Sequence, residues 1–196
     1  MNNIEISSMS HSEWIRYKKK NKDALLNSFP NYNFNARMEI MANFKKILSE
    51  EGVDLFLSGG TLLGYLREGD FIQWDPDVDM DVFAEQLIPK FDTIKNKLTH
   101  LGYITRGIRE YPNMKINAYH SGEKVGIAAL YLNPVKKIRY RYRYKWPASL
   151  YERGQNIIFK NMNFQAPDVL GYVEHTYGKD WNTPSKENYF NRSLYI

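Results

Sequence analysis

Apolar residues follow two different patterns along the chain, and these patterns predict its helices and strands. Between Ala36 and Glu50 the apolar residues recur at steps of three and four, the spacing of a helix with one buried face. Residues 86–100 repeat this spacing. Gly52 and Gly102 follow these two segments, as glycine often does just past a helix end. The short apolar run at 53–57 instead predicts a buried strand.

Shorter sequence patterns predict the remaining helices and strands. We expect a short helix at 61–67, strands at 103–108, 114–119 and 125–132, a strand pair near 155–165, and a last helix that Pro167 opens. The order helix, strand, helix and then a strand-rich half predicts an α+β fold, a mixed sheet flanked by helices. A chain of this length is expected to form one domain. We assign it to residues 35–196, with residues 1–34 as a peripheral helix and loop.

Composition narrows the class of protein. Hydrophobic residues make up 43% of the 196 positions, which argues against a disordered chain. No run approaches the roughly 18 to 20 apolar residues of a membrane-spanning helix, and the first residues lack the apolar core of a signal peptide. A cytoplasmic location is therefore the default expectation. The absence of cysteine excludes disulfides and a thiolate zinc site, and the net charge of +5 allows an anionic partner.

The most unusual pattern is DFIQWDPDVDMDV at residues 70–82, with an aspartate at every second position from Asp75 to Asp81. In an extended strand, successive side chains point to opposite faces. We therefore expect Asp77, Asp79 and Asp81 on one face. Asp75 joins them if the chain is extended through Pro76.

Two interpretations of this acidic face are open. It is either a solvent-exposed face of an edge strand, where repulsion between like charges is small, or a partly buried cluster that holds a cation. The large apolar residues around it, Phe71, Ile72, Trp74 and Phe83, favour burial. Oxygen ligands without histidine or cysteine suit Mg²⁺ or Mn²⁺ better than zinc. Such ions commonly bridge phosphates to carboxylates during phosphoryl transfer.

The turn Ser58-Gly59-Gly60-Thr61 lies between the strand at 53–57 and the helix at 61–67. Backbone N–H groups at a helix start favour an anion such as phosphate, and glycine lets a ligand approach the backbone closely. The alternative is an ordinary tight turn in which Thr61 caps the helix. A glycine turn followed about sixteen residues later by a D-x-D strand is more specific than either feature alone.

At this point a family resemblance is evident. The segment LSGGTLLGYLREGDFIQWDPDVDMDV (57–82) resembles the signature of the LicD/fukutin family, within the nucleotidyltransferase (polymerase-β-like) superfamily. The segment FQAPDVLGYVEHTYGKDWNTP (164–184) is similar to the closing element of that family. The resemblance implies the nucleotidyltransferase fold. It also implies transfer of a phospho-alcohol, of the phosphocholine or alditol-phosphate type, from a CDP-activated donor to a hydroxyl of a glycan, such as a polysaccharide or lipopolysaccharide, with release of CMP.

The resemblance also implies roles for residues of the two motifs. Gly59, Gly60 and Thr61 would hold donor phosphates, and Arg67 would neutralise charge on the transferred phosphoryl group. Asp77 and Asp79 match the metal-binding D-x-D of the family. Asp75 matches the acid after the tryptophan and would be a further ligand or a base.

The chain departs from the family pattern at a third carboxylate, which relatives usually carry on a later strand. Here the matching stretch is VGIAALYL, with Ala128 or Ala129 where that aspartate would fall. Asp81, Glu123 or Asp75 are alternatives for the missing group, and we include Asp81 in the expected metal set. A catalytically degenerate relative is a further alternative.

The segment KKIRYRYRYKWP at 136–147 alternates basic and aromatic residues. If extended, it has one cationic and one aromatic face, and it is either an amphipathic strand or a substrate-binding segment. We expect Arg139 and Arg141 to reach the donor diphosphate or an anionic acceptor. A nucleic-acid partner is less expected, because so short a stretch cannot form a binding groove by itself.

Two other functions therefore remain beside phospho-alcohol transfer. One is transfer of a whole nucleotidyl group from an NTP, with release of pyrophosphate. The other is a non-catalytic binding module, which predicts salt-dependent binding without divalent metal. His120 and His175 are expected at the surface or in packing rather than in catalysis.

Overall fold

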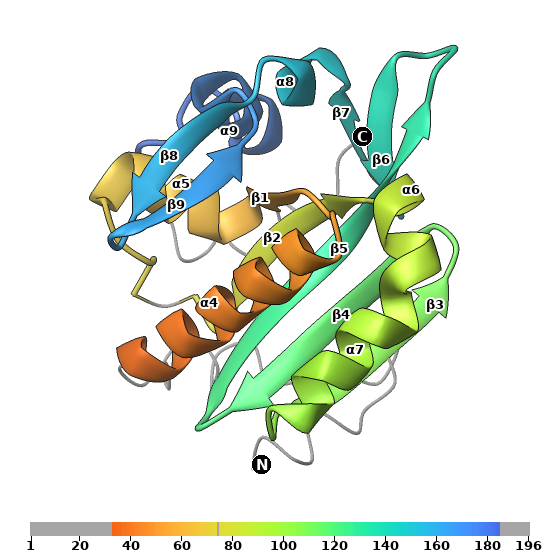
Figure 1. Ribbon diagram of the computed structural model, residues 1–196. Coiled ribbons are helices and arrows are strands. Elements are labelled where there is room, and N and C mark those ends of the chain that lie inside the picture. The colour runs from red at the N-terminus through yellow and green to blue at the C-terminus, as the bar shows by residue number, and fades with distance from the viewer. Residues whose placement is uncertain (1–32, 74, 185–196) are drawn as a thin grey trace, which may run out of the picture.

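A computed structural model describes residues 33–73 and 75–184, and within this part nine strands form one mixed sheet (Figure 1). The strands are β1 Leu55–Leu57, β2 Val78–Phe83, β3 Ile104–Glu110, β4 Asn113–His120, β5 Glu123–Asn133, β6 Ile138–Arg141, β7 Tyr144–Pro147, β8 Gln155–Phe159 and β9 Met162–Ala166. Their order is β3-β4-β5-β2-β1-β9-β8, and the hairpin β6–β7 pairs with the end of β5. β2 runs parallel to β5 and antiparallel to β1, so the sheet is mixed.

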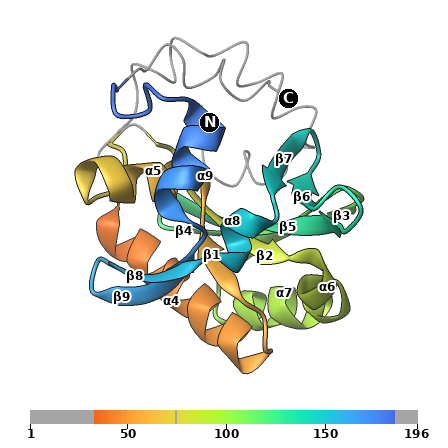
Figure 2. The same ribbon diagram turned by 90° about the horizontal axis from the view of Figure 1, so that it is seen from above.

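Helices cover both faces of this sheet. They are α4 Phe34–Glu50, α5 Gly59–Glu68, α6 Ala84–Leu87, the 3₁₀ turn η1 Ile88–Lys90, α7 Phe91–His100, α8 Ser149–Glu152 and α9 Val169–Tyr177. Figure 2 shows α4 and α7 on one side of the central strands and α5 and α9 on the other. The α+β class that the sequence predicts is confirmed.

Alternation along β2 divides its side chains between the core and the opposite face. Val78, Met80 and Val82 are fully buried in the hydrophobic core, to which α4 and α7 also contribute. Because side chains of a strand alternate, Asp79 and Asp81 lie on the opposite face, the side on which α5 packs against β2. The hydrophobic pattern of β2 therefore fixes the direction in which its aspartates point.

The strand itself is shorter than the sequence suggests. β2 begins at Val78, so Asp75 and Asp77 precede it in an irregular segment. The chain is therefore not extended as one strand through Pro76, and only Asp79 and Asp81 belong to the regular ladder. A proline has no backbone N–H with which to join such a ladder.

One expected helix was wrong, and a segment whose conformation the sequence left open folds as a hairpin. The helix expected at 86–100 is divided into α6, η1 and α7, because Pro89 cannot donate a helical hydrogen bond. The basic segment 136–147 is not one extended strand but the hairpin β6–β7. Its turn contains Tyr142 in the left-handed region, with φ of 50°.

The peripheral segment expected at the N-terminus lies outside the described residues, except for Asn33 and Phe34. Asn33 caps α4, with its side chain accepting a hydrogen bond from the backbone N–H of Ala36, and Phe34 is the first residue of that helix. The division at residue 34 stays a prediction. Within the described part of the chain, no helix is both long and apolar enough to cross a membrane.

Candidate functional site

Asp79 is the central carboxylate of the candidate site. Its backbone N–H donates a hydrogen bond of 3.0 Å to Thr61 Oγ1, which ties β2 to the first turn of α5. Its side chain lies against the glycine turn, because a Cβ added to Gly59 would be 2.9 Å from Asp79 Oδ2. Within the described residues, the half-buried carboxylate of Asp79 has no hydrogen bond and no ion pair.

The surroundings of Asp79 disfavour its negative charge. Burial raises the pKa of Asp79, and the neighbouring charge of Asp77 raises it further, while Lys124 and Arg141 act in the opposite direction. A buried carboxylate without a paired cation is unfavourable. Asp79 is therefore a position at which a bound cation would be stabilising.

Asp77 is paired with a lysine from the start of β5. Lys124 Nζ donates to Asp77 Oδ2, and both side chains are largely buried. Burial alone would lower the pKa of Lys124, but Asp77 and Asp79 raise it above its usual value. Lys124 is therefore a fixed positive charge beside the two aspartates of the D-x-D.

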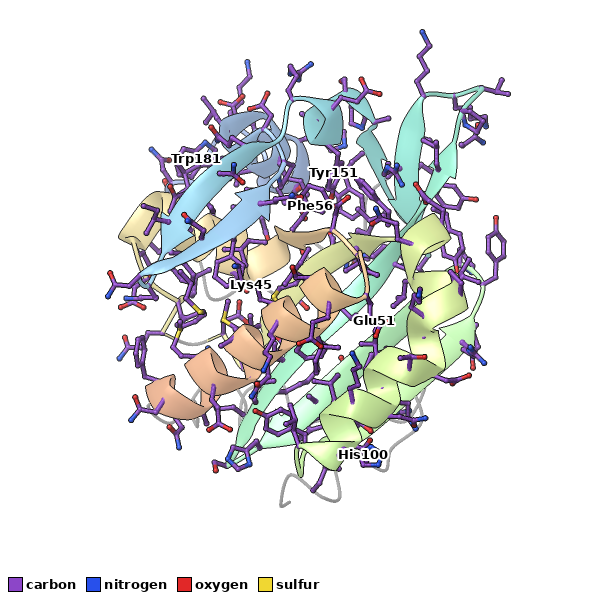
Figure 3. All side chains as sticks on the ribbon, viewed as in Figure 1. Lys45, Glu51, Phe56, His100, Tyr151 and Trp181 are labelled. Atoms are coloured by element: carbon purple, nitrogen blue, oxygen red, sulfur yellow. The ribbon has the colours of Figure 1, made fainter. Side chains whose placement is uncertain are left out.

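Asp81 is fully buried, and both of its oxygens are engaged. Arg141 Nη1 donates to Asp81 Oδ1 at 2.6 Å, and the hydroxyl of Tyr151 donates to Asp81 Oδ2 at 3.1 Å. Figure 3 shows Tyr151 beside Phe56, whose ring centroid lies 5.4 Å from that of Tyr151. Burial raises the pKa of Asp81, and Arg141 opposes the shift. In this structure Asp81 holds Arg141 at the site.

Asp75 lies at the other side of the glycine turn. A Cβ at Gly60 would overlap Asp75 Oδ2, so glycine is required for the carboxylate to approach the start of α5. The backbone carbonyl of Asp75 accepts a 2.7 Å hydrogen bond from Arg37 Nη2. Arg37 also pairs with Glu123, so the carboxylate of Glu123 is engaged away from the D-x-D.

The glycine turn thus contacts carboxylates on both sides. Gly59 has a φ of +54°, which glycine adopts more readily than other residues, and its N–H donates to the hydroxyl of Tyr172 at 3.0 Å. Thr61 is inside α5 rather than at its N-cap, which is Ser58. In the structure, Gly59, Gly60 and Thr61 position Asp75 and Asp79; their role in phosphate binding stays a prediction.

The three expected arginines lie in different surroundings. Arg141 is in the site, beside Asp81. Arg139 instead pairs with Glu85 at 2.8 Å, with its guanidinium 3.5 Å from the centre of the Phe83 ring. Arg67 lies in the last turn of α5, about 12 Å along the helix from Gly59, where it pairs with Glu68.

Several site residues escaped the sequence analysis: Arg37, Lys115, Lys124, Tyr151 and Tyr172. Tyr172 stands inside the C-terminal motif, which could have indicated it. The others lie on segments that carried no motif, and only the sheet and its helices bring them to β2. His120 and His175 lie outside the site, as expected: His120 lies 4.0 Å from Glu39, and His175 Nε2 contacts the carbonyl of Lys145 at 2.9 Å.

The carboxylates of the site are suited to bind Mg²⁺ only if phosphates and waters supply the other ligands. Within the described residues, no group of three His, Cys, Asp or Glu side chains is arranged to hold a metal ion. Mg²⁺ is, however, usually bound by one or two carboxylates, with phosphates and waters completing its coordination. Asp77 and Asp79 can provide those carboxylates, whereas the oxygens of Asp81 are already engaged.

Comparison with known proteins identifies what the chain is similar to. Residues 52–169, more than half of the chain, match the family model described as LicD/FKTN/FKRP, nucleotidyltransferase domain. The human ribitol-5-phosphate transferase FKTN is 24% identical over 201 residues, covering 92% of this chain and 42% of FKTN. The human ribitol 5-phosphate transferase FKRP is 46% identical over 41 residues, covering 21% of this chain and 8% of FKRP.

The chain was also compared with solved structures. The antibiotic-resistance factor ANT(2'')-Ia superimposes with a TM-score of 0.49 at 12% identity, covering 81% of this chain and 83% of that chain. The chain spans less than half the length of the curated relatives it matches.

Proposed function

Because the chain belongs to the LicD/FKTN/FKRP family, we propose that it transfers a phospho-alcohol from a CDP-activated donor to a hydroxyl of a glycan and releases CMP. One observation carries the proposal most directly. The half-buried carboxylate of Asp79, next to Asp77 and the glycine turn, has no cationic partner among the described residues. Such a carboxylate is suited to a divalent cation that also contacts phosphate.

The residues around Asp79 have separable roles in this proposal. Asp77 and Asp79 bind Mg²⁺, which neutralises charge on the donor diphosphate when bound. Arg141, held by Asp81, adds a positive charge next to the transferred phosphoryl group. Asp75, adjacent to Gly60, is the candidate acceptor for the proton of the attacking hydroxyl. We restrict the metal ligands to Asp77 and Asp79, because Arg141 and Tyr151 bind both oxygens of Asp81, whereas the ion pair of Asp77 with Lys124 is made through Oδ2.

The test begins with the donor. CDP-ribitol, CDP-choline, CDP-glycerol, CMP and CTP are titrated calorimetrically into the protein, with Mg²⁺ and with EDTA. Products are then analysed with candidate glycan acceptors. Metal-dependent binding of one CDP-alcohol and release of CMP support the proposal. Release of pyrophosphate from CTP would instead establish nucleotidyl transfer, and salt-sensitive glycan binding without metal would establish a binding module.

Asp79→Asn is the variant that tests the metal assignment. It keeps the shape of the side chain but removes its charge, so we expect loss of Mg²⁺-dependent donor binding and a fall in CMP release of at least about 100-fold. Asp92→Asn is the matched control, because Asp92 is exposed and pairs with Arg109 at the surface. Full activity of Asp79→Asn would show that the metal assignment is wrong.

A further inference from the structure

The strand beside the aspartates has unusually small side chains at the site. Gly126 and Ala128 of β5 pair with Asp79 and Asp81 of β2. Paired residues of neighbouring strands place their side chains on the same face. The face next to Asp79 and Asp81 is therefore lined on this side by one hydrogen and one methyl group. Ala129, the other position considered for a third carboxylate, is fully buried in the core.

The next strand places a lysine and an asparagine beside this small-residue floor. Lys115 and Asn117 of β4 pair with Ala128 and Gly126, so they share the face of Asp79. The side chain of Asn117 lies over Gly126, because a Cβ at that glycine would overlap Asn117 Oδ1. Lys115 lies close enough to Asp79 and Lys124 for their charges to affect its pKa.

Neither of these polar side chains has a partner within the described part of the chain. Asn117 is only 6% exposed and Lys115 is half-buried, yet neither side chain makes a hydrogen bond or ion pair there. Burying a donor without a partner is unfavourable. Two such donors on adjacent positions of one face indicate a ligand that accepts hydrogen bonds.

The charge of Lys115 indicates that the ligand of Lys115 and Asn117 is an anion. Burial, and secondly the nearby charge of Lys124, lower the pKa of Lys115 to about 8. At pH 7 the ammonium is still mostly protonated. With Lys124 and Arg141 also at the site, this side of Asp79 is cationic. An ammonium and an amide N–H₂ together suit the oxygens of a phosphate group.

We propose that Lys115 and Asn117 form a phosphate-binding subsite over Gly126 and Ala128, which holds the donor diphosphate beside Asp79. The inference rests on the proposed function, because the donor supplies the phosphate, and it names residues that the family motifs do not contain. Ala128 is consistent with this subsite, because an aspartate at this position would face Lys115 and pair with it.

The test uses pyrophosphate, titrated calorimetrically into the protein at pH 7 with Mg²⁺ present. Lys115→Met should weaken pyrophosphate binding roughly tenfold, the effect of losing one charge-assisted hydrogen bond. Lys115→Arg should retain most of the affinity because it keeps the charge. Asn117→Leu and Ala128→Asp should both weaken binding. Lys136→Met, which removes an exposed lysine in the turn before β6, should leave the affinity unchanged.

Several results would overturn the subsite. Pyrophosphate that fails to bind the wild-type protein, or binds Lys115→Met and Asn117→Leu normally, excludes it. Normal pyrophosphate binding with lost turnover in both Lys115→Met and Lys115→Arg assigns Lys115 to proton transfer instead. Misfolding is checked by thermal denaturation of each variant, and Ala128→Asp tests the subsite with Lys115 intact. If pyrophosphate binding depends on Lys115 but no CDP-alcohol yields CMP, the subsite stands and the proposed function fails.

Discussion

Asp79 and Asp81 are two residues apart on the same face of β2, yet their carboxylates have opposite surroundings. Arg141 and Tyr151 bind both oxygens of Asp81, whereas the carboxylate of Asp79 lies against Gly59 without a cationic partner in the described part of the chain. Burial raises the pKa of both. The carboxylate of Asp81 therefore stabilises the fold, whereas that of Asp79 is suited to bind a ligand.

Asn substitutions at these two positions should have opposite effects on stability. Asp81→Asn leaves the charge of Arg141 unpaired in a buried site and should lower the free energy of unfolding by about 3 kcal/mol. Asp79→Asn removes an unpaired buried charge and should raise it. Urea denaturation of both variants in EDTA measures the difference. Equal destabilisation of the two variants would contradict the distinction between them.

The same reasoning predicts a pH dependence for Asp79. Its pKa in the folded protein is raised above 3.8, the ordinary value of an aspartate. The folded state therefore binds the proton more tightly than the unfolded state does. Ionisation of Asp79 therefore removes stability as the pH rises from about 4 through the folded pKa. The stability gained by Asp79→Asn over wild type should grow across this range in EDTA and be absent below it. A pH-independent difference would show that Asp79 is not responsible.

At the scale of elements, the start of α5 and the segment before β2 fit together only because the turn has glycines. The carboxylate of Asp75 occupies the space where a side chain at position 60 would begin. The hairpin β6–β7 is the second such element. It folds back at Tyr142, directly after Arg141, whose side chain reaches Asp81.

Gly60→Ala should therefore displace Asp75 and destabilise the protein by about 1 to 3 kcal/mol, as overpacking does. A double-mutant cycle with Asp75→Ala separates the cause. If the carboxylate is what the new methyl group contacts, Gly60→Ala should have a much smaller effect in the Asp75→Ala background. Urea denaturation gives all four values. Additive effects would mean that the strain arises elsewhere.

At the scale of the whole molecule, Arg37 connects three distant parts of the chain. From α4 it pairs with Glu123 at the start of β5 and donates to the carbonyl of Asp75. Both side chains of the pair are buried. The first turn of α4 thereby supports the segment that leads into the D-x-D, although 38 residues separate Arg37 from Asp75.

Arg37→Met should lower the free energy of unfolding by about 3 kcal/mol, because it leaves Glu123 buried without its cation. Arg109→Met is the matched control, since Arg109 and Asp92 form an exposed ion pair of 3.0 Å. Loss of an exposed pair should cost at most about 1 kcal/mol. Chemical denaturation measures the free energy of unfolding of both variants. Equal losses in Arg37→Met and Arg109→Met would show that the buried ion pair of Arg37 does not stabilise the fold more than an exposed one.

The sequence by itself determined most of the elements and the acidic motif. Periodicity at 36–50 and alternation at 78–82 are local properties, since each residue's burial follows from its spacing on one helix or strand. The glycine turn and the D-x-D were likewise evident from their spacing, and with them the family. The break in the helix at Pro89 and the turn at Tyr142 were missed, because the residues on both sides of each continue the same pattern of apolar and polar positions.

Only the tertiary structure decided which charges share the site. Lys115, Lys124, Arg141 and Tyr151 come from four separate segments, and only the strand order together with the packing of α8 brings them close to the aspartates of β2. The sequence showed an alanine at position 128 but not the lysine beside it, because cross-strand pairing depends on register. It likewise could not distinguish Asp79 from Asp81. A charge is paired or unpaired according to groups that are close in space, and these groups lie far apart along the chain.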